Sequence, residues 1–318
     1  MAVSFSAKVK EEICREDVPA RHCRIAQISA AAAFGGRIQQ ARDGRKFLEL
    51  RTENAAVARK YFTLLKKTFN ISDDVEIRQA PGQNRSRTYL LQIRDGKELE
   101  DLLSACRLQT GQDGTLMPAD DLAIQQDCCR RAFIRGAFLA AGSVSNPVRS
   151  YHYEIVSQSA QKAEFLGRIM EHFGIAARTV LRKGHFVLYV KDSSQVVDLL
   201  NIMGAHSALM DMENVRIMKD LRNRVNRSFN CEVANINKTA AAAVKQITDI
   251  EYIRQCGAFQ NMPENLQETA SLRRQYPEAT LEQLGSMLDK PIGKSGVNHR
   301  LKKISEFAQE LRSQRETQ

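Results

Sequence analysis

Residues 133–143 read FIRGAFLAAGS, a helix-forming run of small and apolar side chains that stops at Gly142. Residues 28–36 read ISAAAAFGG and have the same character. Alanine and glycine let two helix backbones approach each other closely, because no bulky side chain holds them apart. We therefore expect the two runs to form helices that pack together and join two halves of one domain.

The segments that follow these two helices repeat in the same order. Periodicity predicts for the first copy a helix over 24–34, a strand over 46–52, a helix over 54–69, strands over 74–79 and 87–94, and a helix over 97–108. For the second copy it predicts a helix over 128–141, a strand over 152–157, a helix over 160–173, strands over 177–182 and 185–191, and a helix over 194–203. Gly35, Gly36 and Gly142 are expected to stop the leading helices. The repeated order indicates an internal duplication, with two unrelated α+β segments as the alternative.

Two further helices are expected after the repeats. Residues 210–225 have helical spacing and are basic, with Arg222, Arg224 and the following Arg227 among the cations. This segment either lies along DNA phosphates or presents a solvated basic face. Residues 234–253 predict a long helix with a buried stripe of Ile236, Ala240, Ala243, Ile247 and Ile250.

The end of the chain has the pattern of a helix-turn-helix. A helix over 265–276 is stopped by Pro277, and Thr280 with Gln283 forms a capping box for the next helix. After a break at 289–293, which is longer than usual, a second short helix is expected to start at Lys294 or Ser295 and to bury Val297, Leu301 and Ile304.

The exposed face of that second helix supplies the candidate DNA contacts. In a helix-turn-helix the second helix enters the major groove, where Asn, Arg, Lys and Ser can bond to base edges. Lys302 and Lys303, one turn further on, suit phosphates better. The candidates are Thr280, Lys294, Ser295, Asn298, His299, Arg300, Lys302 and Lys303. A polar helix in a plain helical bundle is the alternative interpretation.

Charge supports a polyanionic partner. The 318 residues carry a net charge of +10, and the segment from Arg216 onward holds 17 Lys and Arg against 12 Asp and Glu. That third of the chain is the denser positive region. No apolar run approaches the length of a membrane span, and the first ten residues lack a secretory pattern, so we expect no membrane partner and a cytoplasmic, nucleoid-associated protein.

The seven cysteines predict neither a zinc site nor a disulfide framework. They include no C-x-x-C pair and no matching histidine spacing. Cys128 and Cys129 are adjacent, which leaves two interpretations: a redox-active pair, or buried reduced thiols in a helix.

Residues 133–143 are similar to the motif helix of LAGLIDADG homing endonucleases, and residues 28–36 resemble a more eroded copy. The resemblance implies an α+β fold in which each repeat has the order αββαββα, the two motif helices pair at a pseudo-twofold axis, and the sheets form a DNA saddle. On such sheets Arg78, Arg87, Arg178, Arg182 and Lys191 are candidate DNA contacts.

The resemblance also shows what is missing for cleavage. Active members of that family hold a divalent metal on an acidic residue just before the last glycine of each motif. The matching positions here are Gly35 and Ala141, which bind no cation. Asp127 and Glu154, the nearest acidic residues to the second motif, are expected to be solvated. We therefore expect no catalytic residue, no metal and no cofactor.

Nearly the whole chain resembles the WhiA family of bacterial transcription regulators. The resemblance is carried by residues 4–12 (SFSAKVKEE), 135–143 (RGAFLAAGS), 226–231 (NRSFNC) and 294–300 (KSGVNHR). It implies sequence-specific binding of promoters in double-stranded DNA, a role in cell division, sporulation or chromosome segregation, and contact with another regulator or RNA polymerase. A residual metal-dependent endonuclease and a protein-interaction adaptor in cell division are the rival functions.

The predicted domain limits follow from these assignments. They are an N-terminal segment over 1–20, the first repeat over 21–110, a linker over 111–127, the second repeat over 128–210, a basic linker helix over 211–233 and an all-α helix-turn-helix domain over 234–318.

Overall fold

The chain begins with a helix that periodicity did not reveal. The computed structural model describes residues 4–41, 44–71, 75–81, 87–94 and 96–316. Within them α1 (Phe5–Arg15) starts at Ser4, whose hydroxyl accepts a hydrogen bond from the Ala7 amide at 3.1 Å. Val9 and Ile13, one turn apart, are fully buried. The N-terminal segment is therefore part of the folded core.

The first repeat is an antiparallel sheet with three helices. Its elements are α2 (Arg21–Gly35), β1 (Gly36–Gln40), β2 (Lys46–Thr52), α3 (Ala55–Phe69), β3 (Val75–Pro81), β4 (Arg87–Arg94) and α4 (Lys97–Ala105). The strand order is β1-β2-β4-β3. Asn54 caps α3, and the left-handed Asn70 ends it. The two short strands β5 (Leu108–Thr110) and β6 (Leu116–Pro118) and a 3₁₀ turn (Leu122–Ile124) lead to the second repeat.

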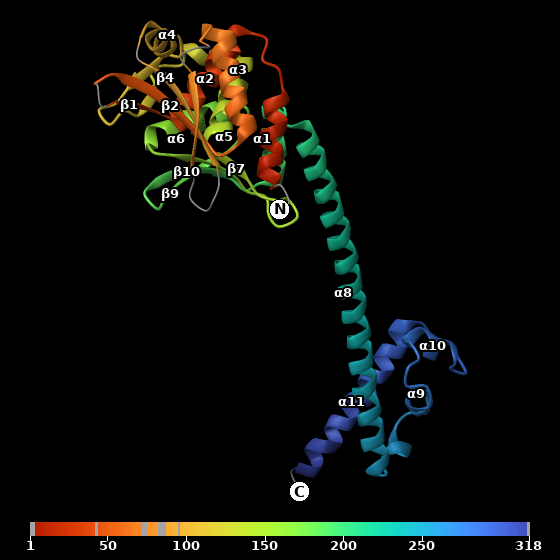
Figure 1. Cartoon of the computed structure of the whole chain (residues 1–318). Helices are drawn as coiled ribbons and strands as arrows, with labels where there is room; N and C mark the ends of the chain where they lie inside the picture. Colours follow the sequence, from red (N-terminus) through yellow and green to blue (C-terminus); the bar gives the residue numbers. More distant parts are fainter. Residues whose placement is uncertain (1–3, 42–43, 72–74, 82–86, 95, 317–318) are drawn as a thin grey trace. The chain divides into compact units, whose positions relative to one another are not determined.

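The second repeat has the same topology. Its elements are α5 (Asp127–Ala141), β7 (Gly142–Val144), β8 (Tyr153–Ser157), α6 (Ala160–Glu171), β9 (Arg178–Arg182), β10 (His185–Val190) and α7 (Ser193–Met203). The strand order is β7-β8-β10-β9. Both repeats therefore follow αββαββα, and the predicted α+β class and duplication are confirmed (Figure 1).

The glycines expected to stop the motif helices also start strands, which periodicity did not predict. Gly36 is the first residue of β1 and Gly142 the first of β7. A Cβ on Gly36 would lie 2.6 Å from the Ala32 carbonyl oxygen, and one on Gly142 would lie 2.3 Å from Cδ2 of Phe138. The chain turns from helix to strand so tightly that only glycine fits, so each sheet has one strand more than periodicity predicts.

The motif helices α2 and α5 pack against each other in the centre of the duplicated unit, as expected (Figure 1). A Cβ on Gly136 would lie 2.3 Å from the Gln27 carbonyl oxygen, and one on Gly35 would lie 3.0 Å from the Ala140 Cβ. Ala30, Ala137 and Phe138 are fully buried at this contact. One continuous hydrophobic core joins the two repeats through these helices.

One continuous helix replaces the two that were expected after the repeats. Helix α8 (His206–Gln255) is 50 residues long. No glycine or proline interrupts the sequence between Gly204 and Gly257, so nothing ends the helix in the predicted linker. The predicted buried stripe is only half correct: Ile250 and Ala243 are buried, whereas Ile236 is 66% exposed.

The chain divides into two compact units, residues 1–219 and 220–318. The second is all-helical: the end of α8, a 3₁₀ turn (Phe259–Asn261), α9 (Glu264–Gln275), α10 (Leu281–Ser286) and α11 (Lys294–Glu316). Its core includes Ile250, Ile253, Ala270, Leu284, Val297, Leu301 and Ile304. Helix α11 is 23 residues long and is therefore not the short helix that was predicted.

Candidate nucleic-acid interface

Helices α10 and α11 are held as a pair by local sequence. Thr280 caps α10 with the predicted capping box: its hydroxyl accepts from the Gln283 amide at 3.2 Å, and the Gln283 side chain accepts from the Thr280 amide at 2.9 Å. A Cβ on Gly285 would lie only 2.1 Å from the Ile292 carbonyl oxygen. The turn over residues 287–293 therefore packs directly on the α10 backbone and fixes where α11 begins.

Helix α11 buries one face and exposes the other. Val297, Leu301 and Ile304 are at most 1% exposed and face the core, as predicted. The residues exposed on the other side are Lys294, Ser295, Asn298, His299, Lys302 and Lys303. Ser295, Asn298 and His299 are spaced by three and four residues and so share one face near the helix start. Lys302 pairs with Glu306 at 3.7 Å across one turn.

Arg300 does not lie on the exposed face, where helical spacing placed it. Its side chain is 18% exposed and donates to the Asn265 carbonyl at 3.2 Å and the Thr269 hydroxyl at 3.3 Å. Glu268 lies 3.8 Å from the same guanidinium. Arg300 therefore ties α11 to α9, and these bonds compete with any contact to a base.

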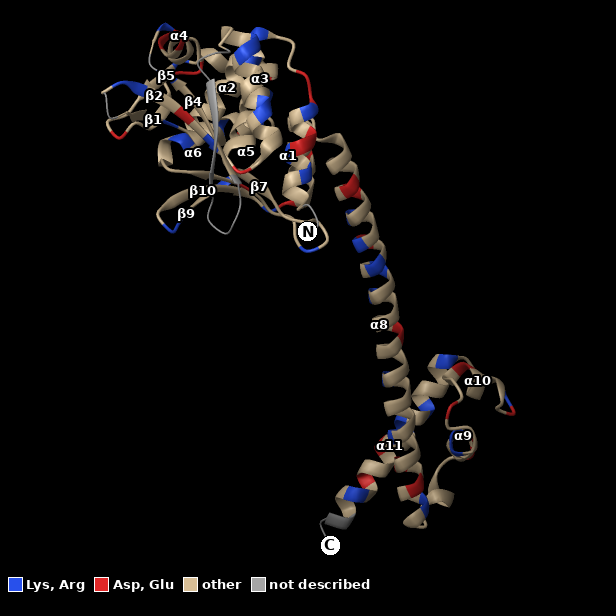
Figure 2. Ribbon diagram, viewed as in Figure 1, with Lys and Arg blue, Asp and Glu red and all other residues tan. Residues whose placement is uncertain are grey.

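Three arginines in the middle of α8 are exposed as a group. Arg222, Arg224 and Arg227 all lie in a stretch where every side chain is solvent-exposed, and Figure 2 shows the cations along this helix. Arg227 donates through Nε to the Asn223 carbonyl at 3.2 Å. These exposed arginines remain candidates for phosphate contacts.

The sheets carry part of the predicted basic set. Arg178 and Arg182 lie on β9, all of whose residues are exposed, and Lys191 follows β10 with its ammonium 5.2 Å from the centre of the Tyr189 ring. Arg78 and Arg87 lie on β3 and β4, but their side chains lie outside the described residues.

The acidic residues near the second motif are paired rather than simply solvated. Asp127 is 65% exposed and bonds to Arg130 at 2.8 Å and His172 at 2.7 Å. Glu154 is only 26% exposed and accepts from the Ser143 hydroxyl at 3.0 Å, with His152 also at 3.0 Å. The expectation for Glu154 was wrong, because Glu154 lies opposite Ser143 in the β7–β8 pair and both Ser143 and His152 contact its carboxylate.

Lysine ammonium groups lie at the C-terminal ends of the motif helices, beside the positions that the resemblance to LAGLIDADG endonucleases matches to metal-binding carboxylates. Gly35 and Ala141 are the last residues of α2 and α5. Lys162 donates to the Ala33 carbonyl of α2 at 2.8 Å, and Lys10 donates to the Leu139 carbonyl of α5 at 3.3 Å. Burial lowers the pKa of Lys10 to about 8 and also lowers the pKa of Lys162. Each ammonium supplies positive charge to the negative end of a helix dipole without a divalent ion.

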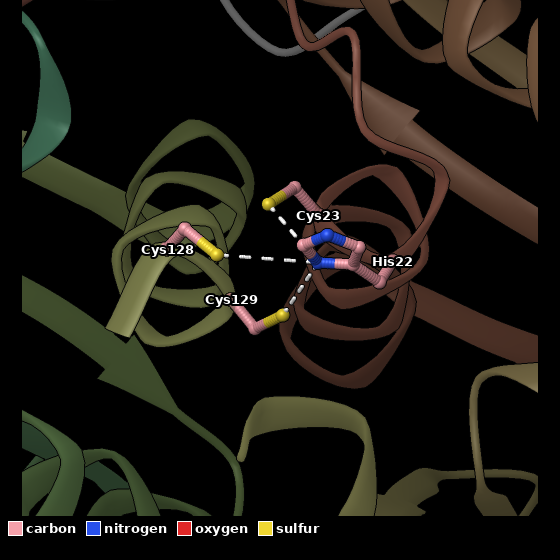
Figure 3. Close-up of side chains that lie close together, drawn as sticks. All are labelled: His22, Cys23, Cys128 and Cys129. Carbon is pink, nitrogen blue, oxygen red and sulfur yellow. Dashed lines mark hydrogen bonds between the residues drawn. The ribbon is translucent and has the colours of Figure 1, made fainter. Parts of the chain in front are cut away.

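The opposite ends of the same helices bring together a group that motif spacing did not predict. His22 and Cys23 from α2 lie beside Cys128 and Cys129 from α5, with one donor atom of each within 4.8 Å of every other (Figure 3). We call these four residues the His–Cys cluster. Desolvation, followed by the neighbouring thiols, raises the pKa of Cys23 to about 12, and desolvation also raises that of Cys129.

Spacing rules could not reveal this cluster, because its two pairs lie 106 residues apart. The duplication contains the missing signal. The same offset separates Gly36 from Gly142, so His22 corresponds to Cys128 and Cys23 to Cys129. Aligning the two motif helices would have placed all four side chains at matching ends.

Comparison with known proteins identifies the family. Three family models match: the WhiA N-terminal LAGLIDADG-like domain at residues 21–108, the WhiA LAGLIDADG-like domain at 130–222 and the WhiA C-terminal HTH domain at 225–308. A probable cell division protein WhiA from Lachnoclostridium phytofermentans is 51% identical over 98% of this chain and 100% of its own length. The chain belongs to the WhiA family. A second probable cell division protein WhiA, from Clostridium novyi, is 42% identical over 98% of this chain and 99% of its length.

Solved structures of the WhiA family share the fold. Full-length DUF199/WhiA from Thermatoga maritima matches with a TM-score of 0.58 at 22% identity, covering 97% of this chain and 99% of that one. The N-terminal LAGLIDADG domain of a DUF199/WhiA protein matches with a TM-score of 0.52 at 19% identity, over 64% of this chain and 92% of that one. Among the helices of the described ranges, none has the length and hydropathy to cross a bilayer.

Proposed function

We propose that this WhiA-family chain is a sequence-specific DNA-binding regulator of transcription and not an enzyme. The observation that carries the proposal is the two-sided character of α11, whose Val297 and Leu301 are buried while Asn298 and His299, between them, are exposed. A helix fixed in this way on α9 and α10 presents a rigid row of hydrogen-bonding groups to a major groove.

The cations around that row divide by their position. Lys302 and Lys303 lie one turn after Asn298 and His299, where a helix seated in the groove meets the phosphate backbone. Arg222, Arg224 and Arg227 on α8 add exposed positive charge. Phosphate contacts contribute affinity that is independent of sequence, whereas contacts with base edges select the site.

Two features support a regulator rather than a nuclease. Gly35 and Ala141 supply no ligand, and the Lys10 and Lys162 ammonium groups bond to the helix ends where a metal ion would be needed. The relatives are named probable cell division proteins, so we extend the proposal to promoters of genes that act in cell division.

The main experiment separates base reading from phosphate binding. DNA fragments are first selected from a random pool by the wild-type chain, and binding to selected and random DNA is then measured by fluorescence anisotropy. Asn298→Ala with His299→Ala is expected to reduce preference for selected DNA by about 10-fold or more, since each good base contact is worth roughly 1–3 kcal/mol. Lys302→Ala with Lys303→Ala is the matched control and should weaken both DNAs alike. Unchanged preference in the first variant would remove α11 as the reader.

A second assay addresses the rival functions. Supercoiled plasmid incubated with the chain and Mg²⁺ or Mn²⁺ should be retarded on a gel and remain uncut. Nicking that a Lys10 or Lys162 substitution alters would contradict the proposal and favour a residual endonuclease. Affinity for selected DNA that is weak and insensitive to salt would instead favour a protein-interaction adaptor.

A further inference from the structure

The His–Cys cluster lies in the first turns of α2 and α5, at the ends away from Gly35 and Ala141 (Figure 3). Three sulfur atoms surround a single ring nitrogen: the distances from His22 Nδ1 to the Sγ atoms of Cys129, Cys23 and Cys128 are 3.1, 3.4 and 4.0 Å. One imidazole nitrogen either donates one hydrogen bond or accepts one. Hydrogen bonding to His22 therefore accounts for one of these approaches and not for three.

A tetrahedral metal accounts for all of them. Zinc binds cysteine sulfur at about 2.3 Å and histidine nitrogen at about 2.0–2.1 Å, which in a tetrahedron separates nitrogen from sulfur by about 3.6 Å. The three observed nitrogen–sulfur distances lie on both sides of that value. The donor set of three thiolates and one imidazole is one of the common sets for structural zinc.

Burial raises the pKa of the Cys23 and Cys129 thiols, so a bound metal ion is what would hold them as thiolates. The pairs His22–Cys23 and Cys128–Cys129 each lie in the first turn of a helix, where free backbone amides and the positive end of the helix dipole favour negative charge. Cys23 and Cys129 are buried, whereas His22 and Cys128 are exposed, which gives a metal a route of entry from solvent.

We propose that the His–Cys cluster binds one Zn²⁺ ion as a structural site that fastens the two repeats together. All four ligands come from the protein, so the ion has no open position for a substrate or an activated water. Two ligands come from each repeat, at positions related by the duplication. The ion links α2 to α5 at one end of their contact, roughly 20 Å along the helices from Gly35 and Ala141. This inference does not depend on the proposed DNA function.

Metal content of the full-length chain is the direct test. The chain is purified without a histidine tag or chelator, and zinc is measured by inductively coupled plasma mass spectrometry. Wild type should hold about one zinc per chain, and Cys129→Ser and Cys128→Ser should lose most of it. Cys231→Ser is the matched control, because Cys231 is also exposed on a helix but has no part in the cluster. Zinc content that stays the same in the Cys129 variant would overturn the proposal.

A second measurement uses only the wild-type chain, so it does not depend on whether a variant folds. Metal-free protein is titrated with Co²⁺, and the expected result is the intense visible absorption of tetrahedral cobalt bound to thiolates, with an endpoint at one equivalent. Zinc should then displace the cobalt and raise the melting temperature, because a ligand bound only by the folded state stabilises it. Absence of that spectrum with the thiols reduced would contradict the site. A disulfide joining Cys23 to Cys128 or Cys129 in freshly purified protein would show a redox pair instead.

Discussion

The duplicated unit and the C-terminal helical unit differ in how much of their central helices they bury. In the duplicated unit the central helices α2 and α5 bury small residues on each other, and buried lysines bond to their ends. In the helical unit the key helix α11 buries only one face and leaves hydrogen-bonding groups such as Asn298 and His299 without a core role. The central helices of the first unit are used for internal packing, whereas α11 keeps polar groups exposed, as the proposed DNA contact requires.

The largest effect is expected from breaking the central helix contact. Gly136→Ala adds a Cβ that would lie 2.3 Å from the Gln27 carbonyl and 2.9 Å from the Ala30 Cβ, so two helix backbones must separate. We expect a loss of about 3 kcal/mol in the free energy of unfolding, at the upper end for overpacking. Hydrogen exchange should show weakened protection in α2 and α5 and unchanged protection in α11.

The control for that variant is another helical glycine. A Cβ on Gly167 in α6 would have its nearest contact at 3.9 Å, with a leucine side chain. Gly167→Ala should therefore be neutral or stabilise by up to about 1 kcal/mol through helix propensity. Equal losses in the two variants would show that the close contact between α2 and α5 is not what matters.

The second largest effect is expected in the helical unit. Gly285→Ala places a Cβ 2.1 Å from the Ile292 carbonyl, and because that carbonyl belongs to a turn, the turn can shift. We expect a loss of about 2 kcal/mol confined to residues 220–318, with weaker binding to selected DNA. Limited proteolysis should cut first near 287–293. Cleavage that begins in the duplicated unit would contradict this assignment.

The central helices, the turn at Gly36 and helix α8 illustrate how much of the fold could be predicted from the sequence. The pairing of α2 with α5 followed from the small residues themselves, and the resemblance supplied the order αββαββα. The turn into β1 was missed because Gly36 both ends a helix and starts a strand, which periodicity cannot separate. Helix α8 was divided wrongly because its apolar residues lack one constant buried face, as exposed Ile236 shows.

The candidate site also has features that the sequence predicted and one that it did not. Local rules found the Thr280 capping box and the exposed Asn298, since both depend on neighbours within one turn. They failed for Arg300, whose partners Asn265 and Thr269 lie more than thirty residues away in the chain. Tertiary contacts of that kind decide whether a cation is free or used internally.

A smaller effect tests the phosphate side of the comparison. Lys302→Ala with Lys303→Ala should reduce the steepness of the log–log salt dependence of binding by about 0.9 for each phosphate that the variant no longer neutralises. Anisotropy titrations at salt concentrations from about 50 to about 200 mM would measure it. Lys66→Ala with Lys97→Ala removes two exposed lysines of the duplicated unit and should leave the slope unchanged. A matching decrease in this control would mean that the duplicated unit also binds phosphates.

The smallest effect concerns a buried charge. Because the pKa of Lys10 falls from 10.5 to about 8 on folding, the unfolded chain holds this proton more tightly between pH 8 and 10.5. The contribution of Lys10 to the free energy of unfolding is therefore lowest at pH 7 and rises between about pH 8 and pH 10.5. Each unit of the lowered pKa corresponds to about 1.4 kcal/mol of unfavourable burial, and Lys10→Met removes that cost. Because the variant also loses the hydrogen bond to the Leu139 carbonyl, we expect a net gain of only about 1 kcal/mol in the free energy of unfolding at pH 7. The gain should shrink by pH 10 in urea titrations, and a constant gain would contradict burial as its cause.

The two lysines at the ends of the motif helices have a consequence for metal binding there. They come from different elements, Lys10 from α1 and Lys162 from α6, yet each holds the end of a motif helix. A carboxylate introduced at position 35 or 141 would lie two residues along the chain from a carbonyl that already accepts a hydrogen bond from a lysine ammonium. A metal site at the ends of these helices would therefore require replacement of the lysines as well as of Gly35 and Ala141.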